Sequence, residues 1–282
     1  MTTQRRERVW TIVVAGGSGT RFGGPKQYET LGEQRVVDWA VQAARAASDG
    51  VVLVVPAADA EREGAVAGGS SRSESVRAGL AVVPADATVV CVHDGARPFA
   101  DSALFERVVA AVVAGADAAI PGIAVADTIK QVASKQVDGK QVTGMQVDGV
   151  RHVVHTPDRA SLVAVQTPQA FRADVLRAAH ASAGDATDDA ALVEAAGGSV
   201  VVVAGDARNR KITDPADLRW ARDQVAGEQV AGEQATNEQG TGAAMQVRVG
   251  QGFDIHRFSD DPARVLVLGG VVFEGERGLH GH

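Results

Sequence analysis

Residues 13–26 decide the fold and read Val13-Val14-Ala15-Gly16-Gly17-Ser18-Gly19-Thr20-Arg21-Phe22-Gly23-Gly24-Pro25-Lys26. The apolar run at residues 9–15 has the β-branched composition of a buried strand. The glycines that follow let backbone N–H groups face a ligand without a side chain in the way, and Arg21 and Lys26 add two cations. The stretch therefore predicts a polyphosphate site after a strand, with a simple surface turn as the alternative.

Two common phosphate-binding patterns do not fit this loop. A Walker loop needs Gly-Lys-Ser/Thr, but Pro25 precedes Lys26 and Gln27 follows it. A dinucleotide fingerprint needs Gly-x-Gly-x-x-Gly, but Phe22 stands where the third glycine belongs. The loop is neither.

Composition narrows the class of protein. The 282 residues suffice for one large domain or two smaller ones, and a net charge of −7 argues against nucleic-acid binding through a basic surface. Cys91 is the only cysteine, so no internal disulfide can form, and we predict that Cys91 is a small residue of the core. No apolar stretch approaches the ~20 residues of a membrane span, and the N-terminus lacks a signal-peptide pattern, which favours a cytoplasmic protein.

Apolar runs alternate with helix-like segments over the first two hundred residues. Strands are predicted at 9–15, 51–55, 88–92, 118–123 and 200–204. Helices are predicted at 36–47, 75–83, 102–114, 173–183 and 188–196, and Asp214-Pro215 opens another that ends near Gln224. This alternation predicts an α/β fold with a mostly parallel sheet, whose ligands bind beyond the carboxyl ends of the strands.

Two segments depart from this alternation of strands and helices. Residues 127–156 alternate polar and apolar residues loosely, which indicates a β-hairpin-like arm that contacts a second subunit rather than a floppy loop. From Val225 an acidic, Gly- and Gln-rich pentad repeats, which is typical of a solvated linker. We therefore predict a first domain at 1–225, a flexible linker at 226–245 and an incomplete second domain at 246–282.

Four more clusters are candidate site residues, each with a plainer alternative. They are Gly68 to Ser75 (an ordinary helix cap), His93 to Pro98 (a structural ion pair), Asp158-Arg159 with Thr167-Pro168-Gln169, and Arg208 to Thr213 (a solvated charged face). Capping would also explain Thr187-Asp188. The first domain shows no nucleophile triad motif and no zinc spacing. Its cations, glycines and few carboxylates suit phosphoryl or nucleotidyl transfer.

Taken in order, these motifs resemble one family. They are residues 15–28, Gly69-x5-Ser75-Val, Val92-His-Asp-Gly-Ala-Arg-Pro, Asp127-Thr-Ile-Lys, Thr167-Pro-Gln-Ala-Phe, Thr187-Asp-Asp and Lys211-Ile-Thr-x-Pro-x-Asp-Leu. Residues 11–222 are similar to the 2-C-methyl-D-erythritol 4-phosphate cytidylyltransferases of the non-mevalonate isoprenoid pathway. The resemblance implies a Rossmann-like nucleotidyltransferase fold, a homodimer with exchanged arms, and CTP with Mg²⁺.

The resemblance also implies roles for individual residues. Arg21 and Lys26 would stabilise charge at the α-phosphate, while Arg159 and Lys211 would hold the methylerythritol phosphate. The cytidine would be framed by Ala15, Gly16, Gly17, Gly19, Gly69 and Ser75. The sugar alcohol or the magnesium would contact Asp94, Arg97 and Thr187. One departure is Arg208, which stands where some relatives have an aspartate, although Asp206 is nearby.

The end of the chain resembles the start of a second family, the α+β 2-C-methyl-D-erythritol 2,4-cyclodiphosphate synthases. Asp254 and His256 lie two residues apart, which on a strand puts both side chains on one face as two ligands of a divalent metal such as zinc. His282 matches a histidine that contacts the substrate diphosphate. The sequence ends there, before the family's second histidine ligand, so we expect no working cyclase in this chain.

Two other functions remain open. A cytidylyltransferase for another polyol phosphate, such as ribitol 5-phosphate, has similar loops, although the cyclase-like segment favours methylerythritol. A nucleotide-binding module without catalysis is the third possibility, and the presence of Arg21, Lys26, Arg159 and Lys211 together argues against it.

Overall fold

The computed structural model describes residues 7–17, 19, 22–133, 135–137, 140–142, 152–181, 186–237, 259, 261, 265–268 and 271–277. Its contacts divide the chain into two units, Met1–Ala231 and Gly232–His282. In the described part of the second unit, β15 (Val265–Leu268) pairs antiparallel with β16 (Val271–Arg277). Asp254, His256 and His282 lie outside the described residues.

An eight-stranded sheet organises the described part of the first unit. Its centre is β1 (Val9–Val14), which lies between β4 (Gly50–Val55) and β6 (Val89–Asp94) and runs parallel to both. The short β5 (Val66–Ala67) continues the parallel pairing beyond β4. Every residue of β6 is buried, which explains why this strand reads as an unbroken apolar run until His93.

The other half of the sheet mixes strand directions. β7 (Ala118–Ala124) pairs in parallel with β14 (Val200–Ala204) and antiparallel with β12 (Val163–Val165). β13 (Gln169–Arg172) runs antiparallel between β6 and β7. Neither β12 nor β13 was predicted, because strands of three and four residues are too short to show a period. The predicted α/β fold with a mostly parallel sheet is confirmed, and the antiparallel strands β12 and β13 make the sheet a mixed one.

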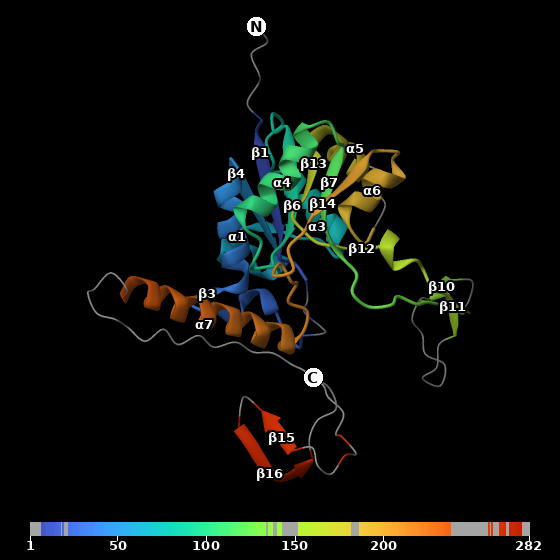
Figure 1. The fold of residues 1–282 in the computed structure, drawn as a ribbon. Helices are drawn as coiled ribbons and strands as arrows, with labels where there is room; N and C mark the ends of the chain where they lie inside the picture. The colour runs from blue at the N-terminus through green and yellow to red at the C-terminus, as the bar shows by residue number, and fades with distance from the viewer. Residues whose placement is uncertain are drawn as a thin grey trace. The chain divides into compact units, whose positions relative to one another are not determined.

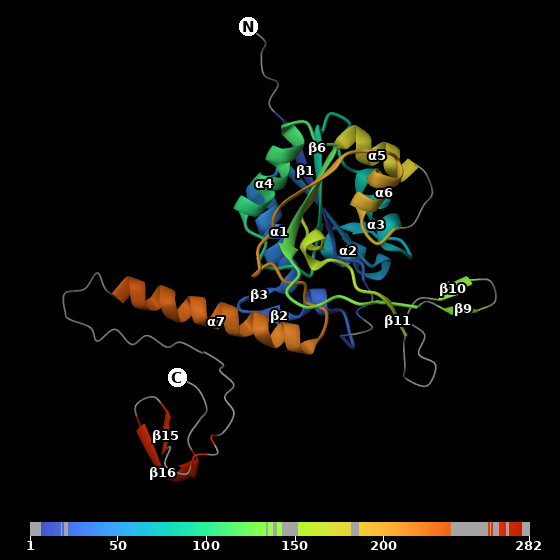
Figure 2. The same cartoon turned by 45° about the vertical axis from the view of Figure 1, so that its right-hand side comes forward.

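Helices cover both faces of this sheet (Figures 1 and 2). On one face α1 (Val36–Ala47) and α4 (Ser102–Val113) bury their apolar side chains against β1 and β6. On the other face lie α3 (Arg72–Leu80), α5 (Ala173–Ala181) and α6 (Asp189–Ala195). The five helices predicted before residue 200 are thus all present, with ends that differ by up to three residues.

The helix that begins at Pro215 is longer than predicted. α7 (Pro215–Asn237) begins where the sequence indicated, since the Asp214 carboxylate accepts hydrogen bonds from the N–H groups of Ala216 and Asp217. The predicted end near Gln224 is wrong, because Ala, Glu and Gln favour helix and the pentads continue it to Asn237. Val225 is buried in a small core with Leu31 and Ile212. That residues 226–245 act as a linker stays a prediction.

The segment at 127–156 forms paired strands in its described residues. β8 (Gln131–Val132) pairs antiparallel with β11 (Val153–His155), and β9 (Lys135–Val137) with β10 (Lys140–Val142). These strands belong to no part of the main sheet, and they lead away from it in both ribbon views (Figures 1 and 2). The predicted arm is therefore present as a β structure.

Short elements complete the first unit. They are η1 (Lys26–Tyr28), β2 (Thr30–Leu31), β3 (Gln34–Arg35), η2 (Ala57–Asp59), α2 (Ala60–Glu63) and η3 (Arg159–Ser161). Among the helices in the described ranges, none has the length and hydropathy needed to cross a membrane.

Candidate functional site

A cavity of about 440 Å³ opens at the carboxyl end of β1, where the sequence predicted a ligand site. We call it the larger cavity. All six residues that were predicted to frame the cytidine line this cavity, namely Ala15, Gly16, Gly17, Gly19, Gly69 and Ser75. The predicted site residues Lys26, Asp94 and Lys211 line it as well. The fold therefore gathers segments that lie almost two hundred residues apart in the sequence.

The glycine loop turns tightly at Gly19. Its φ is +65°, and its carbonyl oxygen accepts hydrogen bonds from the N–H groups of Phe22, Gly23 and Gly24. A Cβ at position 19 would collide with the carbonyl oxygen of Gly24, so only glycine fits. In contrast, a Cβ at Gly17 would meet nothing within 4 Å. Ser18, Thr20 and Arg21 lie outside the described residues, so the predicted role of Arg21 stays a prediction.

The loop before α3 lines the same cavity and also caps the helix. The Ser71 hydroxyl accepts a hydrogen bond from the N–H of Glu74, which completes a capping box. Ser75 Oγ donates to the Ser71 carbonyl at 2.9 Å and accepts from the Gly69 N–H at 3.2 Å. The helix cap offered as the plainer alternative is real. It coexists with a place in the cavity wall.

A second cavity of about 230 Å³ adjoins the first, and we call it the smaller cavity. It is lined chiefly by charged and amide side chains, namely Arg72, Asp94, Arg97, Gln166, Gln169, Asp188 and Lys211, with Val165, Thr167 and Thr187. Arg72, Asp94 and Lys211 line both cavities. We call the wall that these three side chains form between the two cavities the junction.

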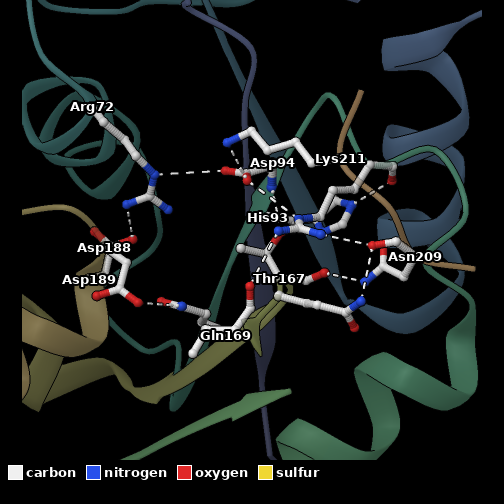
Figure 3. Close-up of polar contacts among 12 residues, drawn as sticks. Arg72, His93, Asp94, Thr167, Gln169, Asp188, Asp189, Asn209 and Lys211 are labelled. Carbon is white, nitrogen blue, oxygen red and sulfur yellow. Dashed lines mark hydrogen bonds and ion pairs between the residues drawn. The ribbon is translucent and has the colours of Figure 1, made fainter. Parts of the chain in front are cut away.

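Asp94 is the centre of charge at this junction (Figure 3). Its carboxylate lies 2.8 Å from Lys211 Nζ, 3.5 Å from Arg97 Nε and 3.8 Å from Arg72 Nε. Burial alone would raise the pKa of this carboxyl group, but the charges of Lys211, Arg72 and Arg97 outweigh it and hold the pKa below its ordinary range. Asp94 is thus a fixed anion among three cations.

Arg72 lies within the candidate cluster Gly68 to Ser75, but the sequence analysis gave it no role of its own. It is the first residue of α3, where the helix dipole disfavours a cation, and this misplaced charge was the signal available in the sequence. Two buried carboxylates compensate the charge of Arg72 in the structure. Its Nη1 lies 2.6 Å from Asp189 Oδ2, and its Nε also contacts Asp94. His180 Nε2 in turn lies 2.9 Å from Asp189 Oδ1.

His93 lies behind Asp94, completely buried at the end of β6. Its Nδ1 is 3.1 Å from Thr167 Oγ1, its Nε2 is 3.2 Å from the Arg97 carbonyl oxygen, and its ring packs against Phe105 at 5.3 Å between centroids. Burial lowers the pKa of His93 to about 4, so the ring is neutral at physiological pH. Asn209 Nδ2 donates to the Thr167 carbonyl oxygen at 2.8 Å, and Arg97 Nη1 donates to the Asn209 carbonyl oxygen at 2.8 Å (Figure 3).

Two predicted positions lie apart from the junction. Arg159, in η3 beyond the arm, lines neither cavity, and its Nη1 donates to the Ala126 carbonyl oxygen at 2.6 Å. Arg208 lies over the Phe99 ring at 5.8 Å, and its N–H donates to Asp206 Oδ1. Within the described ranges, no three His, Cys, Asp or Glu residues come together as a metal-binding group.

A parallel-centred α/β sheet with a glycine loop and gathered cations at its carboxyl edge defines a nucleotide-binding enzyme. The family profile of 2-C-methyl-D-erythritol 4-phosphate cytidylyltransferase matches residues 9–226. The bifunctional enzyme IspD/IspF of Anaeromyxobacter dehalogenans is 43% identical over 99% of this chain and 67% of its own length. The chain thus spans about two thirds of that relative.

Solved structures agree with the sequence comparison. The 4-diphosphocytidyl-2C-methyl-D-erythritol synthase of Anaerococcus prevotii covers 78% of this chain and 99% of its own, with a TM-score of 0.64 and 26% identity. The 2-C-methyl-D-erythritol 4-phosphate cytidylyltransferase of Thermus thermophilus covers 76% and 98%, with a TM-score of 0.60 and 30% identity. The chain belongs to the 2-C-methyl-D-erythritol 4-phosphate cytidylyltransferase family, a family of nucleotidyltransferases.

Proposed function

We propose that this chain transfers the cytidylyl group of CTP to 2-C-methyl-D-erythritol 4-phosphate. The products are 4-diphosphocytidyl-2-C-methyl-D-erythritol and pyrophosphate, and the reaction belongs to non-mevalonate isoprenoid biosynthesis. Family membership supports the reaction. The structural observation that carries the proposal is the junction, because a two-substrate transfer needs two cavities that share a wall where the reacting atoms approach to about 3 Å.

We assign the larger cavity to CTP and the smaller cavity to the polyol phosphate. The glycine backbone at residues 16–19 and the loop at 69–75 suit a base, ribose and phosphates, since they offer N–H groups and hydroxyls. The smaller cavity offers hydroxyl, amide and carboxylate partners for alcohol groups, and Arg97 and Lys211 for the phosphate. Thr187 lines this smaller cavity, which supports the proposed contact with the sugar alcohol.

In the proposed reaction, a phosphate oxygen of the polyol phosphate attacks the α-phosphorus of CTP. The new oxygen–phosphorus bond forms while the bond to pyrophosphate breaks, and its electron pair leaves with pyrophosphate. The attacking phosphate is already an anion, so no general base is required. Lys26, and Arg21 by family resemblance, would stabilise charge on the phosphate oxygens, while Lys211 would hold the attacking phosphate.

Magnesium fits this arrangement as an ion delivered with the triphosphate. Mg²⁺ is commonly held by one or two carboxylates together with substrate phosphates, and Asp94 is the ionised carboxylate in the wall of the larger cavity. The metal would neutralise charge on the phosphates when bound. Arg208 offers no metal-binding oxygen in its side chain, so that position takes no part in our proposal.

We also propose a homodimer formed through the arm. Exposed valines lie on two strands that pair with β7, the strand that enters the arm: Val163 of β12 is 44% exposed and Val202 of β14 is 52% exposed. These two valines flank the same glycine, because a Cβ at Gly122 would meet Val163 Cβ at 3.1 Å and Val202 Cγ1 at 2.8 Å. Apolar side chains grouped in this way favour burial against a second copy.

A dimer would also account for Arg159, which lines neither cavity of its own chain. If a second copy brings its Arg159 to the site, two inactive variants should complement each other. Mixed and refolded Lys26→Ala and Arg159→Ala chains should then recover up to about a quarter of the activity. Recovery of none, with a monomer in light scattering, would contradict the dimer.

Residues 226–282 are also part of the proposal. The match to the bifunctional relative covers 99% of this chain, which supports residues 246–282 as the start of a cyclodiphosphate synthase domain after a linker at 226–245. Zinc at Asp254 and His256 stays a prediction for that segment, and zinc analysis of the purified chain tests it. A cytoplasmic location is consistent with a biosynthetic enzyme and is also part of the proposal.

Pyrophosphate release tests the proposed function. The full chain is incubated with CTP and Mg²⁺, and with either methylerythritol phosphate or ribitol 5-phosphate. We expect release with methylerythritol phosphate. Release with ribitol phosphate alone would assign the other polyol, and release with neither would leave only a nucleotide-binding module.

A further inference from the structure

A buried histidine contacts residues of the smaller cavity without lining it. His93 follows an apolar strand and is completely buried, yet both of its ring nitrogens have polar partners that belong to cavity residues. Thr167 and Arg97 line the smaller cavity, and Asp94 lines both. The ring therefore connects two separate segments of the cavity wall.

The direction of the hydrogen bonds is fixed by the chemistry of the partners. A carbonyl oxygen only accepts, so the contact of Nε2 with the Arg97 carbonyl requires a proton on Nε2. In the neutral ring Nδ1 is then an acceptor, and the Thr167 hydroxyl donates to it. That hydroxyl in turn accepts from the Asp94 N–H at 2.9 Å. The order is therefore Asp94 N–H to Thr167 O–H to His93 Nδ1, and His93 Nε2–H to the Arg97 carbonyl.

The chain of bonds continues into the loop that holds Lys211. Asn209 Nδ2 donates to the Thr167 carbonyl oxygen, and the Arg97 guanidinium donates to the Asn209 carbonyl oxygen. Gln166 Nε2 donates to the carbonyl oxygen of Asp206 at 2.7 Å in the same loop. Hydrogen bonds thus join the carboxyl end of β6, the residues just before β13 and the loop at 206–211, and His93 is the link between Thr167 and Arg97. Figure 3 shows His93, Thr167 and Asn209 grouped together.

We propose that His93 is a positioning residue for the polyol phosphate: its imidazole, hydrogen-bonded through both ring nitrogens, holds Arg97 and the Asp94 backbone in register with Thr167. The inference rests on the proposed function. Its physical basis is the cost of breaking a buried bond, because either ring nitrogen left without its partner is a buried polar group that only movement of the turn at residues 94–97 can relieve.

Substitutions at His93 separate this role from simple packing. His93→Phe keeps an aromatic ring beside Phe105 but removes both hydrogen bonds. His93→Asn retains an acceptor near the Nδ1 position, and His93→Gln retains a donor near the Nε2 position. A packing role predicts that Phe is tolerated best, whereas a positioning role predicts that Phe is the most damaging of the three. Cys91→Ala is the matched control, since Cys91 is buried in the same strand and core but lines neither cavity.

The experiment measures KM for methylerythritol phosphate and for CTP with the full chain and these four variants. We expect His93→Phe to raise the KM for methylerythritol phosphate about tenfold, with smaller rises for Asn and Gln, and a change below about twofold in the KM for CTP. Cys91→Ala should change neither value. An unchanged polyol KM in His93→Phe, or equal rises in both KM values, would overturn the inference while leaving the proposed function intact.

A second measurement keeps the inference testable if His93→Phe does not fold. Long-range ¹H–¹⁵N NMR of the unmutated chain should show His93 with an unprotonated Nδ1 and a protonated Nε2. A ring with a proton on Nδ1 and none on Nε2 would overturn the inference, because Nε2 could not then donate to the Arg97 carbonyl oxygen. Absence of any turnover by the unmutated chain would instead overturn the proposed function itself, and the positioning role with it.

Discussion

The two cavities differ in how their walls are made. Backbone and small side chains supply much of the larger cavity, and the tight turn at Gly19 shapes it. The smaller cavity is lined by charged and amide side chains that hold one another through Asp94, Thr167 and Asn209. Backbone N–H groups can bind the phosphates of CTP without a side chain in the way. Polar side chains that are held in place by one another suit the recognition of the hydroxyl groups of one particular polyol. Substitutions should therefore act differently in the two cavities.

The largest effect is expected from Lys26, which lines only the larger cavity. Lys26→Ala removes a cation from the larger cavity, where we expect negative charge to accumulate on the phosphate oxygens of CTP in the transition state. We expect kcat to fall about a thousandfold with an unchanged unfolding midpoint. The pyrophosphate assay and thermal unfolding measure both quantities. Arg45→Ala, an exposed cation of α1 outside both cavities, is the control, and a Lys26→Ala rate within tenfold of the unmutated rate would contradict the role.

Asp94→Asn should affect stability as well as turnover. The substitution leaves Lys211, Arg72 and Arg97 without their shared anion, and we expect the free energy of unfolding at pH 7 to fall by about 3 kcal/mol. Because the pKa of folded Asp94 lies below its unfolded value, this stabilisation is complete above the unfolded value of about 3.9 and is lost as the pH falls below it. Urea unfolding across pH 3 to 7 measures the difference.

The matched control for this experiment is Asp223→Asn, an exposed position on α7. It should leave the unfolding free energy unchanged at every pH. A difference between Asp94→Asn and the unmutated chain that is the same at pH 3 and pH 7 would show that the charge of Asp94 is not the cause.

Gly19→Ala should destabilise the glycine loop. The left-handed backbone at position 19 costs an alanine about 1 to 2 kcal/mol, and its methyl group would also meet the Gly24 carbonyl oxygen. We expect a lower free energy of unfolding and a higher KM for CTP, with little change in the KM for the polyol phosphate. Urea unfolding and steady-state kinetics report these values, and equal changes in both KM values would argue against separate cavities.

Gly17→Ala offers the smallest and most selective change. A methyl group there meets no protein atom within 4 Å, so the free energy of unfolding should stay within about 0.5 kcal/mol of the unmutated value. The methyl group would still occupy space in the lining of the larger cavity, and we expect the KM for CTP to rise severalfold. A higher polyol KM with an unchanged CTP KM would reverse the assignment of the cavities.

Local sequence patterns predicted much of this architecture. The run at 9–15, the glycines after it and the Asp214-Pro215 helix start all act through neighbours in the chain, so composition and spacing reveal them. The helix beyond Gln224 was missed because glycine-containing pentads were interpreted as linker, although their Ala, Glu and Gln residues favour helix.

The junction could not be predicted in the same way. Arg72 and Asp189 form their ion pair across 117 residues, and Thr167 meets His93 across 74. Such pairs depend on the position of β13 between β6 and β7. A strand of four residues is too short for its hydrophobic pattern to predict this position. The sequence supplied the candidates Asp94, Arg97, Thr187 and Lys211, whereas only the fold assigns them to two adjoining cavities.

The assignment of the two cavities is tested most directly by a crystal structure of the full chain with 4-diphosphocytidyl-2-C-methyl-D-erythritol. We predict the cytidine in the larger cavity against Ala15 to Gly17, the methylerythritol in the smaller cavity beside Arg97 and Thr187, and the diphosphate at the junction. The reverse orientation, or a product bound away from Asp94 and Lys211, would contradict the account.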